Sequence, residues 1–346
     1  MDFLLITSTM MSWGVSLALV LALYAGGVWV LGRVAGRAAA PRVPGGALVV
    51  DLATARPLAL VLHALLSCRW RGRAPGGGGQ LPSVATEAAV VLDASAVASY
   101  AALVGAPAGS GGVTPPCYLQ ALAEVVAMVA LAGSRAMPLL PLPVHVAQTI
   151  DCITPVPRGA TVHLNGRLSA SRRTHRGTEV DYTSVGCVGG ELAFCGTITG
   201  LYRGGGGGVG DAPPPPPARL PEPPSSFEPG VAGEFVLSAQ EGRAYAAVSG
   251  DYNPLHLWPL AGRLLGQPGA IAHGMDVLAR VLAAVEAARR LPPPPWRAEA
   301  RFRRPVVLPA RVVLLLRGDG AGGLAFSVRR GSDRETEHLV GTIRPL

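Results

Sequence analysis

The spacing of apolar residues predicts two long helices, each followed by a series of shorter strands. Apolar positions recur at helical intervals over residues 118–132 and again over residues 271–288. Segments with strand-like patterns follow the first helix at residues 144–153, 160–171, 178–188 and 192–202. Others follow the second helix at residues 296–307, 311–317, 324–330 and 338–344. A long helix laid on an antiparallel sheet, twice over, predicts an α+β fold.

The two units also begin alike, which indicates an internal duplication. VLDASAVASYAALVG at residues 91–105 aligns without gaps on VLSAQEGRAYAAVSG at residues 236–250. Stretches rich in Gly and Pro at residues 71–80 and 204–224 cannot pack a core and therefore separate the units. The predicted division is an N-terminal anchor or targeting segment, a connector, a first domain, a linker and a second domain, at residues 1–42, 43–82, 83–203, 204–227 and 228–346.

The N-terminal segment predicts a membrane anchor. Residues 13–32 are uncharged and long enough to cross a bilayer as a transmembrane helix. Arg33, Arg37 and Arg42 follow this segment and no basic residue precedes it, so the positive-inside rule places the rest of the chain on the cytoplasmic side. The alternatives are a targeting segment for an organelle, such as a mitochondrion or plastid, and a buried hydrophobic helix.

Composition excludes several classes of function. All 30 basic residues are arginine, so the chain has no lysine for a Schiff base or for a Walker-type phosphate loop. The net charge is +8, but the arginines are scattered and aromatic residues make up only 5%, which argues against nucleic-acid binding. The 5 cysteines are widely spaced and odd in number, so they indicate neither a disulfide framework nor a zinc knuckle.

The most informative segment is YAAVSGDYNPLHLWPLAGRLLGQPGAIAHGM, which covers residues 245–275. Taken alone, its Asp251 and Asn253 would most often belong to an ordinary turn, and His256 would most often be a satisfied buried side chain. Together, Ser-Gly-Asp-x-Asn-Pro-x-His and the later Ile-Ala-His-Gly-Met resemble the MaoC-like (R)-specific enoyl-CoA hydratases of the hotdog fold. The resemblance implies an acyl-thioester hydratase or dehydratase.

The chemistry of that reaction assigns roles to three residues. Adding water to an enoyl thioester needs a group that takes the water's proton, a group that protonates the α-carbon, and a donor to the thioester oxygen. Asp251 and His256 are the predicted acid/base pair, because Pro254 prevents a regular helix and lets a tight loop aim both at one spot. The backbone N–H of Gly274, at the positive end of the second long helix, is the predicted oxyanion donor.

Neighbouring residues are expected to contact the substrate or support the loop, namely Ser249, Gly250, Asn253, His273 and Met275. His273 is expected to brace the loop rather than to transfer protons. No metal and no cofactor is expected. A cation held by Asp251, His256 and His273 is the least favoured alternative, because the sequence offers no clear further ligand.

The resemblance extends from about residue 83 to the end and implies a double hotdog, with two long helices each wrapped by an antiparallel sheet. After Gly105 the first copy reads APAGSGGVTPP, without the acidic, amide and imidazole side chains of the second loop. The first copy is therefore expected to be catalytically inactive. By the same resemblance, it is expected to open a tunnel for longer acyl chains.

The predicted function is reversible hydration of trans-2-enoyl thioesters to (3R)-hydroxyacyl thioesters in fatty acid metabolism, with CoA or acyl carrier protein as the thioester carrier. Arg301, Arg303 and Arg304 are candidate contacts for carrier phosphates, although a solvated strand edge is the simpler account of them. One rival function is a hotdog thioesterase that uses Asp276 on the central helix. Another is a non-catalytic acyl-thioester binding protein, and a homodimer is left open.

Overall fold

Two successive sets of strands and helices make up the described part of the chain. The computed structural model describes residues 48–49, 85–107, 112–134, 143–202, 231–264, 266–318 and 322–346. The first set is β1 (Leu48–Val49), β2 (Ala85–Val91), α3 (Ala94–Val104), α4 (Pro116–Ser134), β3 (Val144–Cys152), β4 (Thr161–Thr174), β5 (Gly177–Val188) and β6 (Glu191–Tyr202). The second set is β7 (Val231–Leu237), α5 (Glu241–Ser249), α6 (Pro254–Leu257), α7 (Pro259–Leu264), α8 (Gly274–Ala287), β8 (Trp296–Phe302), β9 (Ala310–Gly318), β10 (Leu324–Arg330) and β11 (Glu337–Pro345).

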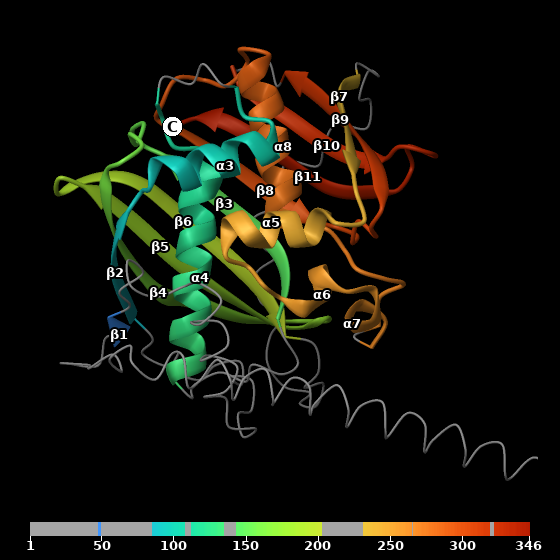
Figure 1. Cartoon of the computed structure of the whole chain (residues 1–346), viewed down its shortest axis with the longest axis horizontal. Coiled ribbons are helices and arrows are strands. Elements are labelled where there is room, and N and C mark those ends of the chain that lie inside the picture. Colours follow the sequence, from blue (N-terminus) through green and yellow to red (C-terminus); the bar gives the residue numbers. More distant parts are fainter. Residues whose placement is uncertain are drawn as a thin grey trace, which may run out of the picture.

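The described strands form one sheet in which the two sets mirror each other. Their order is β1-β2-β4-β5-β6-β3-β8-β11-β10-β9-β7, and every pairing except that of β1 with β2 is antiparallel. Read from edge to centre, β2-β4-β5-β6-β3 of the first half matches β7-β9-β10-β11-β8 of the second. The halves meet where β3 pairs with β8, for example at Ile150 and Ala298 (Figure 1).

The internal repeat corresponds to a strand followed by a short helix in each half. The first copy runs from the end of β2 through α3, and the second from the end of β7 through α5. Both helices end at a glycine in the left-handed conformation, Gly105 with φ 74° and Gly250 with φ 83°. Tyr100 and Tyr245, at equivalent repeat positions, are fully buried with ring centroids 5.8 Å apart. The two copies therefore pack directly against each other.

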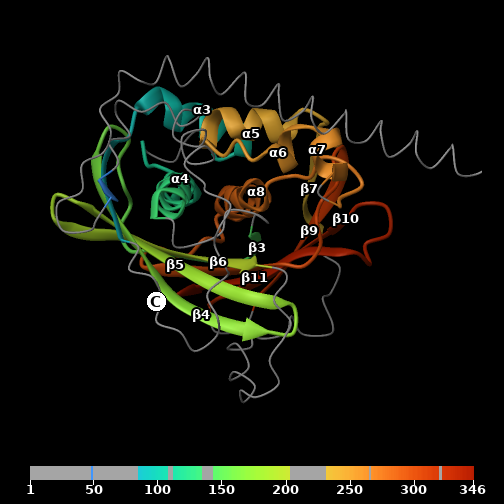
Figure 2. The same ribbon diagram turned by 90° about the horizontal axis from the view of Figure 1, so that it is seen from below.

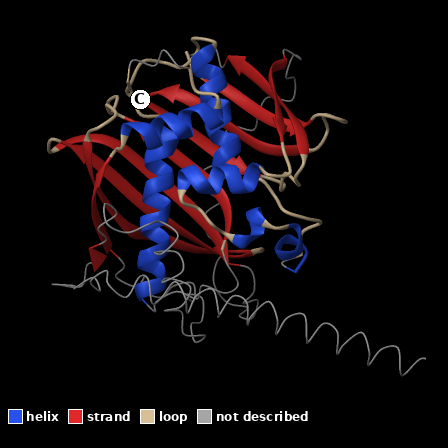
Figure 3. Ribbon diagram, in the orientation of Figure 1, coloured by secondary structure: helices blue, strands red, loops and turns tan. Residues whose placement is uncertain are grey.

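One hydrophobic core fills the space between sheet and helices. Along β2 and most of β4, exposed and buried side chains alternate, so that one face of each strand turns to the interior. The buried cluster is continuous across both halves and includes Tyr100 and Ile150 from the first and Leu278 and Trp296 from the second. In Figure 2, α4 and α8 lie side by side in the trough of the curved sheet, and Figure 3 shows the helices on one face of it. This arrangement agrees with the predicted α+β double hotdog.

Two element ends near the motif differ from the prediction for a common reason. The second long helix begins at Gly274 rather than at residue 271, and β8 ends at Phe302 rather than at residue 307. An isolated antiparallel bridge joins Ile271 to Val307, so the two segments that leave the regular elements pair with each other. Pro305 has no N–H to donate to the sheet, which favours the end of the β8 ladder before it.

Several predictions concern residues outside the described ranges. The predicted anchor at residues 13–32, most of the connector and the linker at residues 204–224 lie there. Within the described ranges, no helix combines the length and the apolarity that crossing a membrane requires.

Candidate active site

A cavity of about 400 Å³ lies where the two halves meet. Most of the predicted site residues line it from the second half, namely Asp251, Asn253, His256, His273, Gly274 and Met275. The wall from the first half is largely apolar and includes Ala127, Val146, Leu168, Tyr182, Ile198 and Tyr202. The cavity therefore places polar chemistry beside a surface suited to an acyl chain.

Ser249 and Gly250 shape the loop and are not part of the cavity wall, and their predicted contact with substrate stays a prediction. Both residues are buried. The Ser249 hydroxyl accepts a hydrogen bond from the backbone N–H of Asp251 over 3.2 Å. Gly250 reverses the chain in the left-handed conformation at the end of α5. Together they direct Asp251 into the cavity.

A single helical turn, α6, follows Asp251. The side-chain oxygen of Asn253 accepts the N–H of Leu255 over 3.1 Å and caps this helix. Pro254 lies at the start of the helix, where its missing N–H costs nothing, and no helix runs through the whole segment from Asp251 to His256, as expected. The backbone N–H of Asn253 donates to Oδ1 of Asp251 over 3.0 Å. The same residue thus caps the turn that carries His256 and orients the carboxylate.

The hydrogen bond of His256 defines which ring nitrogen can act as a base. Its Nδ1 lies 2.9 Å from the carbonyl oxygen of Ile271, which can only accept, so Nδ1 carries the proton. Burial lowers the pKa of His256, while the Asp251 carboxylate and the Ile271 carbonyl oppose that shift. Neutral His256 with an unprotonated Nε2 can take a proton from a water molecule.

His273 has the geometry of the predicted loop brace. The side chain is 2% exposed, and its Nε2 lies 3.1 Å from the backbone carbonyl of Asp251 and 3.5 Å from carboxylate Oδ2. Its ring stacks on that of His256 with centroids 3.9 Å apart. Burial, with a further contribution from His256, lowers the pKa of His273 to about 3, so the ring is neutral and Nε2 donates to the Asp251 carbonyl.

Gly274 is the first residue of α8, and a neighbouring ring requires it to be glycine. The first N–H groups of a helix have no partner within it and lie at the positive end of its dipole. A Cβ on Gly274 would lie 2.6 Å from Cε1 of Phe302. Met275, the next residue, is buried and lines the cavity as predicted.

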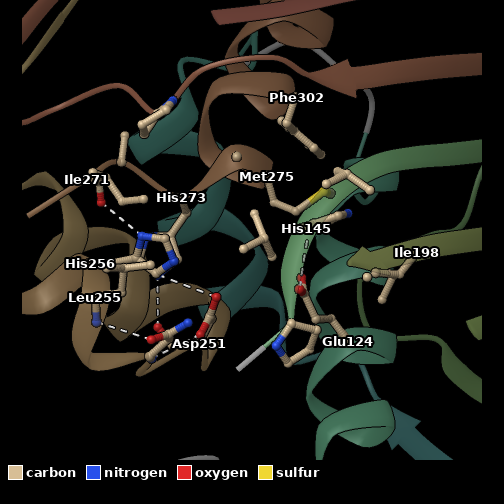
Figure 4. A pocket seen from close by; sticks show the side chains of 18 of the residues that line it. Glu124, His145, Ile198, Asp251, Leu255, His256, Ile271, His273, Met275 and Phe302 are labelled. Atoms are coloured by element: carbon tan, nitrogen blue, oxygen red, sulfur yellow. Dashed lines mark hydrogen bonds and ion pairs between the residues drawn. The ribbon is translucent and has the colours of Figure 1, made fainter. Parts of the chain in front are cut away.

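Polar residues of the first half also line the cavity, and the sequence analysis missed them. Glu124 on α4 and His145 on β3 lie across the cavity from Asp251 and His256 (Figure 4). Burial, and then the Asp251 carboxylate, raises the pKa of Glu124 to about 8, and burial lowers the pKa of His145 to about 4. Both groups are therefore neutral near pH 7. The sequence signal was a single acidic residue in the otherwise apolar helix pattern at residues 118–132.

The geometry bears on two alternative chemistries. One ligand atom from each of Asp251, His256 and His273 lies within 4.8 Å of the others, close enough to face one cation. However, one nitrogen of each histidine is already hydrogen-bonded to a backbone carbonyl, and the expected absence of a metal stays a prediction. Asp276, the carboxylate of the thioesterase alternative, is completely buried, pairs with Arg280 over 2.9 Å and does not line the cavity.

Comparisons with known proteins assign the chain to a family. Residues 228–323 match the family model described as MaoC like domain. The chain is 32% identical over 272 residues to 3-hydroxyacyl-thioester dehydratase X of Mycobacterium tuberculosis, a match that covers 77% of this chain and 91% of the relative. The chain belongs to the MaoC-like dehydratase family. It is a hydro-lyase of the hydratase/dehydratase type, as the motif predicted.

Solved structures of MaoC-like proteins share the fold over most of this chain. The crystal structure of HtdX from Mycobacterium tuberculosis is 30% identical, with a TM-score of 0.62 over 75% of this chain and 100% of that chain. A MaoC-like dehydratase from Phytophthora capsici is 18% identical, with a TM-score of 0.63 over 76% of this chain and 95% of that chain. The second match shows the fold alone.

Proposed function

We propose that the protein interconverts trans-2-enoyl and (3R)-hydroxyacyl thioesters in fatty acid metabolism, with Asp251 and His256 as the acid/base pair. The observation that carries this proposal is the position of the Asp251 carboxylate and the neutral His256 ring in one cavity wall, beside the first turn of α8. The MaoC like domain match and the relative named 3-hydroxyacyl-thioester dehydratase X support it.

In the hydration direction, a water molecule lies between Asp251 and Nε2 of His256. Its oxygen adds to the β-carbon while the acid/base pair accepts one proton. Negative charge moves to the thioester oxygen, where the N–H of Gly274 stabilises it. The pair then delivers a proton to the α-carbon, so one water molecule is consumed and no proton is left over. Dehydration runs through the same steps in reverse.

Two of the three arginines that line the cavity, Arg303 and Arg304, are the predicted contacts for the phosphate of a thioester carrier. Arg303 and Arg304 line the cavity and are exposed, and the nearest carboxylate to Arg303 is that of Glu337 at 4.0 Å. Arg301, the third candidate, lies within β8 opposite Ala147 and is not part of the cavity wall. CoA and acyl carrier protein both carry a pantetheine phosphate, so Arg303 and Arg304 serve either carrier.

The direct test is hydration of crotonyl-CoA by the purified full-length protein, followed as loss of the enoyl-thioester absorbance. The product is resolved on a chiral column, where the (3R) alcohol is expected. The same acyl group on an acyl carrier protein is assayed in parallel to decide which carrier is preferred. If the folded protein hydrates neither thioester, nor any longer enoyl chain, the proposed function is wrong.

One observation favours a thioesterase as the second candidate. Glu124 is a carboxyl group on a central helix, it lines the cavity, and a hotdog thioesterase would use such a group to activate water. Its raised pKa argues against this role, because a protonated carboxyl group is a weak base near pH 7. A thiol-reactive dye added to the hydration assay measures release of free CoA, and release faster than hydration would favour the thioesterase.

The proposal also includes the domain bounds and the cellular location that the sequence predicts. We propose a first domain at residues 83–203, a catalytic domain at residues 228–346, and a membrane anchor that leaves both on the cytoplasmic side. Cell fractionation of the full-length protein, with N-terminal sequencing of the product, tests the anchor against a cleaved organelle-targeting segment. Size-exclusion chromatography with light scattering measures whether the protein forms a homodimer.

A further inference from the structure

The first half contributes a polar pair to a cavity wall that is otherwise mainly apolar. Oε1 of Glu124 lies 3.7 Å from Nδ1 of His145, and the two side chains are 18% and 20% exposed. They come from different elements, α4 and β3, and both line the cavity. Neither belongs to the loop that holds the acid/base pair.

The hydrogen bonds of this pair leave capacity for a ligand. Nε2 of His145 lies 3.0 Å from the carbonyl oxygen of Ala147, so Nε2 is the donor and Nδ1 is left as an acceptor. The 3.7 Å between Nδ1 and the Glu124 carboxyl group exceeds hydrogen-bond distance. Among the residues that the structure describes, none forms a hydrogen bond with the Glu124 carboxyl group. A neutral acid and a neutral imidazole can therefore donate one hydrogen bond and accept another.

The apolar surroundings of the pair raise the free-energy cost of leaving either polar group without a hydrogen-bond partner. Apolar side chains of Ala127, Leu168 and Ile198 belong to the same wall. An acyl chain made only of methylene groups would displace water from Glu124 and His145 without replacing its hydrogen bonds. An acyl chain with an oxygen atom beside Glu124 and His145 would replace those hydrogen bonds.

We propose that Glu124 and His145 form a subsite for an oxygen substituent, a hydroxyl or carbonyl group, on the acyl chain of the substrate. This inference rests on the proposed function and narrows its substrate class to oxygenated acyl chains. The Glu124 carboxyl group donates to the oxygen, and a substrate hydroxyl donates to Nδ1 of His145.

The pair lies across the cavity from the groups proposed to serve the reacting carbons. Phe302 packs on Gly274 from the side on which a Cβ would lie, and His145 contacts the same ring with centroids 4.7 Å apart. Figure 4 shows Glu124 and His145 on the opposite side of the cavity from Asp251 and His256, the proposed acid/base pair that serves the β-carbon. The oxygen bound by Glu124 and His145 is therefore further along the chain than the β-hydroxyl group.

The test compares trans-2-octenoyl-CoA with analogues that carry a hydroxyl group on the fifth, sixth or seventh carbon. We expect the parental protein to prefer at least one hydroxylated analogue by about tenfold or more in kcat/KM. Glu124→Leu should abolish that preference, measured as the ratio of kcat/KM for the hydroxylated chain to kcat/KM for octenoyl-CoA. Glu124→Gln should keep most of the preference, because an amide both donates and accepts.

Leu168→Ala is the matched control, since it alters the same wall without touching the polar pair. It should change the chain lengths accepted but not the ratio between hydroxylated and plain chains of equal length. A parental protein that turns over octenoyl-CoA without preferring any hydroxylated analogue overturns the subsite, whatever the variants do, and leaves the proposed function intact. A folded Glu124→Leu variant that loses crotonyl-CoA turnover about 100-fold also overturns it, because Glu124 would then act in the reaction itself. No turnover of any enoyl thioester overturns both proposals.

Discussion

The Gly274→Ala variant tests the close contact between the first turn of α8 and the Phe302 ring. On an open helix the change would be favourable by up to about 1 kcal/mol, because alanine has the higher helix propensity. Here the new methyl group would lie 2.6 Å, 2.9 Å and 3.1 Å from three ring carbons of Phe302, so the ring or the helix start must move. Overpacking of this kind costs about 1–3 kcal/mol, which outweighs the propensity gain.

The displacement should cost more in activity than in stability. Phe302 is only half-buried and borders the cavity, so its ring can move toward the substrate and relieve part of the strain. Misplacing an oxyanion donor or the bound acyl group lowers kcat/KM by about 10²-fold. We therefore expect Gly274→Ala to unfold at slightly lower denaturant concentration and to hydrate crotonyl-CoA about 100-fold more slowly.

A double-mutant cycle with Phe302→Leu tests the cause. The smaller side chain removes the ring carbons that the new methyl group meets, so the double variant should be more stable and more active than Gly274→Ala alone. Contacting residues show coupling energies of about 0.5–3 kcal/mol in such cycles, and the measured value should fall in that range with a compensating sign. A Gly274→Ala variant with near-parental rates, or a double variant no better than the single one, would refute the reasoning.

Three further predictions follow from the same contacts. Asp251→Asn and His256→Ala should each lower the hydration rate of crotonyl-CoA by about 10²-fold to 10⁴-fold at unchanged folding, and near-parental rates in both would show that the assigned pair is wrong. Burial lowers the pKa of His256, so the neutral base persists below pH 6.5, the ordinary pKa of a histidine being about 6.5. The acid limb of the pH profile of kcat/KM should therefore lie below pH 6.5, and an acid limb above that pH would contradict this. Arg280→Leu should lower the free energy of unfolding by about 3–5 kcal/mol, since it leaves the fully buried Asp276 without its partner, and a change under about 1 kcal/mol in urea titration would contradict that.

The periodic and local features of the protein could be predicted from its sequence. The helical spacing of apolar residues located α4 and α8, and strand patterning located the strands that follow each of them, because these signals arise within a few residues of each other. The sequence repeat that contains Tyr100 and Tyr245 predicted that the two halves are structurally alike. The Asp251 and His256 loop was identified for the same reason, since its turn residues and its functional residues are neighbours in the chain.

Element ends and cavity membership depended on contacts between distant segments. Residue 271 looked like the start of a helix, but its bridge to Val307 draws it into an extended conformation. No local pattern reports this pairing, because it depends on where the segment around Val307 packs.

Spacing along the chain is enough to predict the two helix-and-strand units, their duplication and the loop that carries the proposed acid/base pair. The predicted anchor at residues 13–32 stays a prediction. That Glu124 and His145 face the cavity between the halves follows from tertiary packing. These residues reach it because β3 pairs with β8 at the centre of the sheet, which brings the helix and strand of the first half against the catalytic loop of the second. Burial then sets their protonation, and burial is a property of the packed chain that no single segment contains.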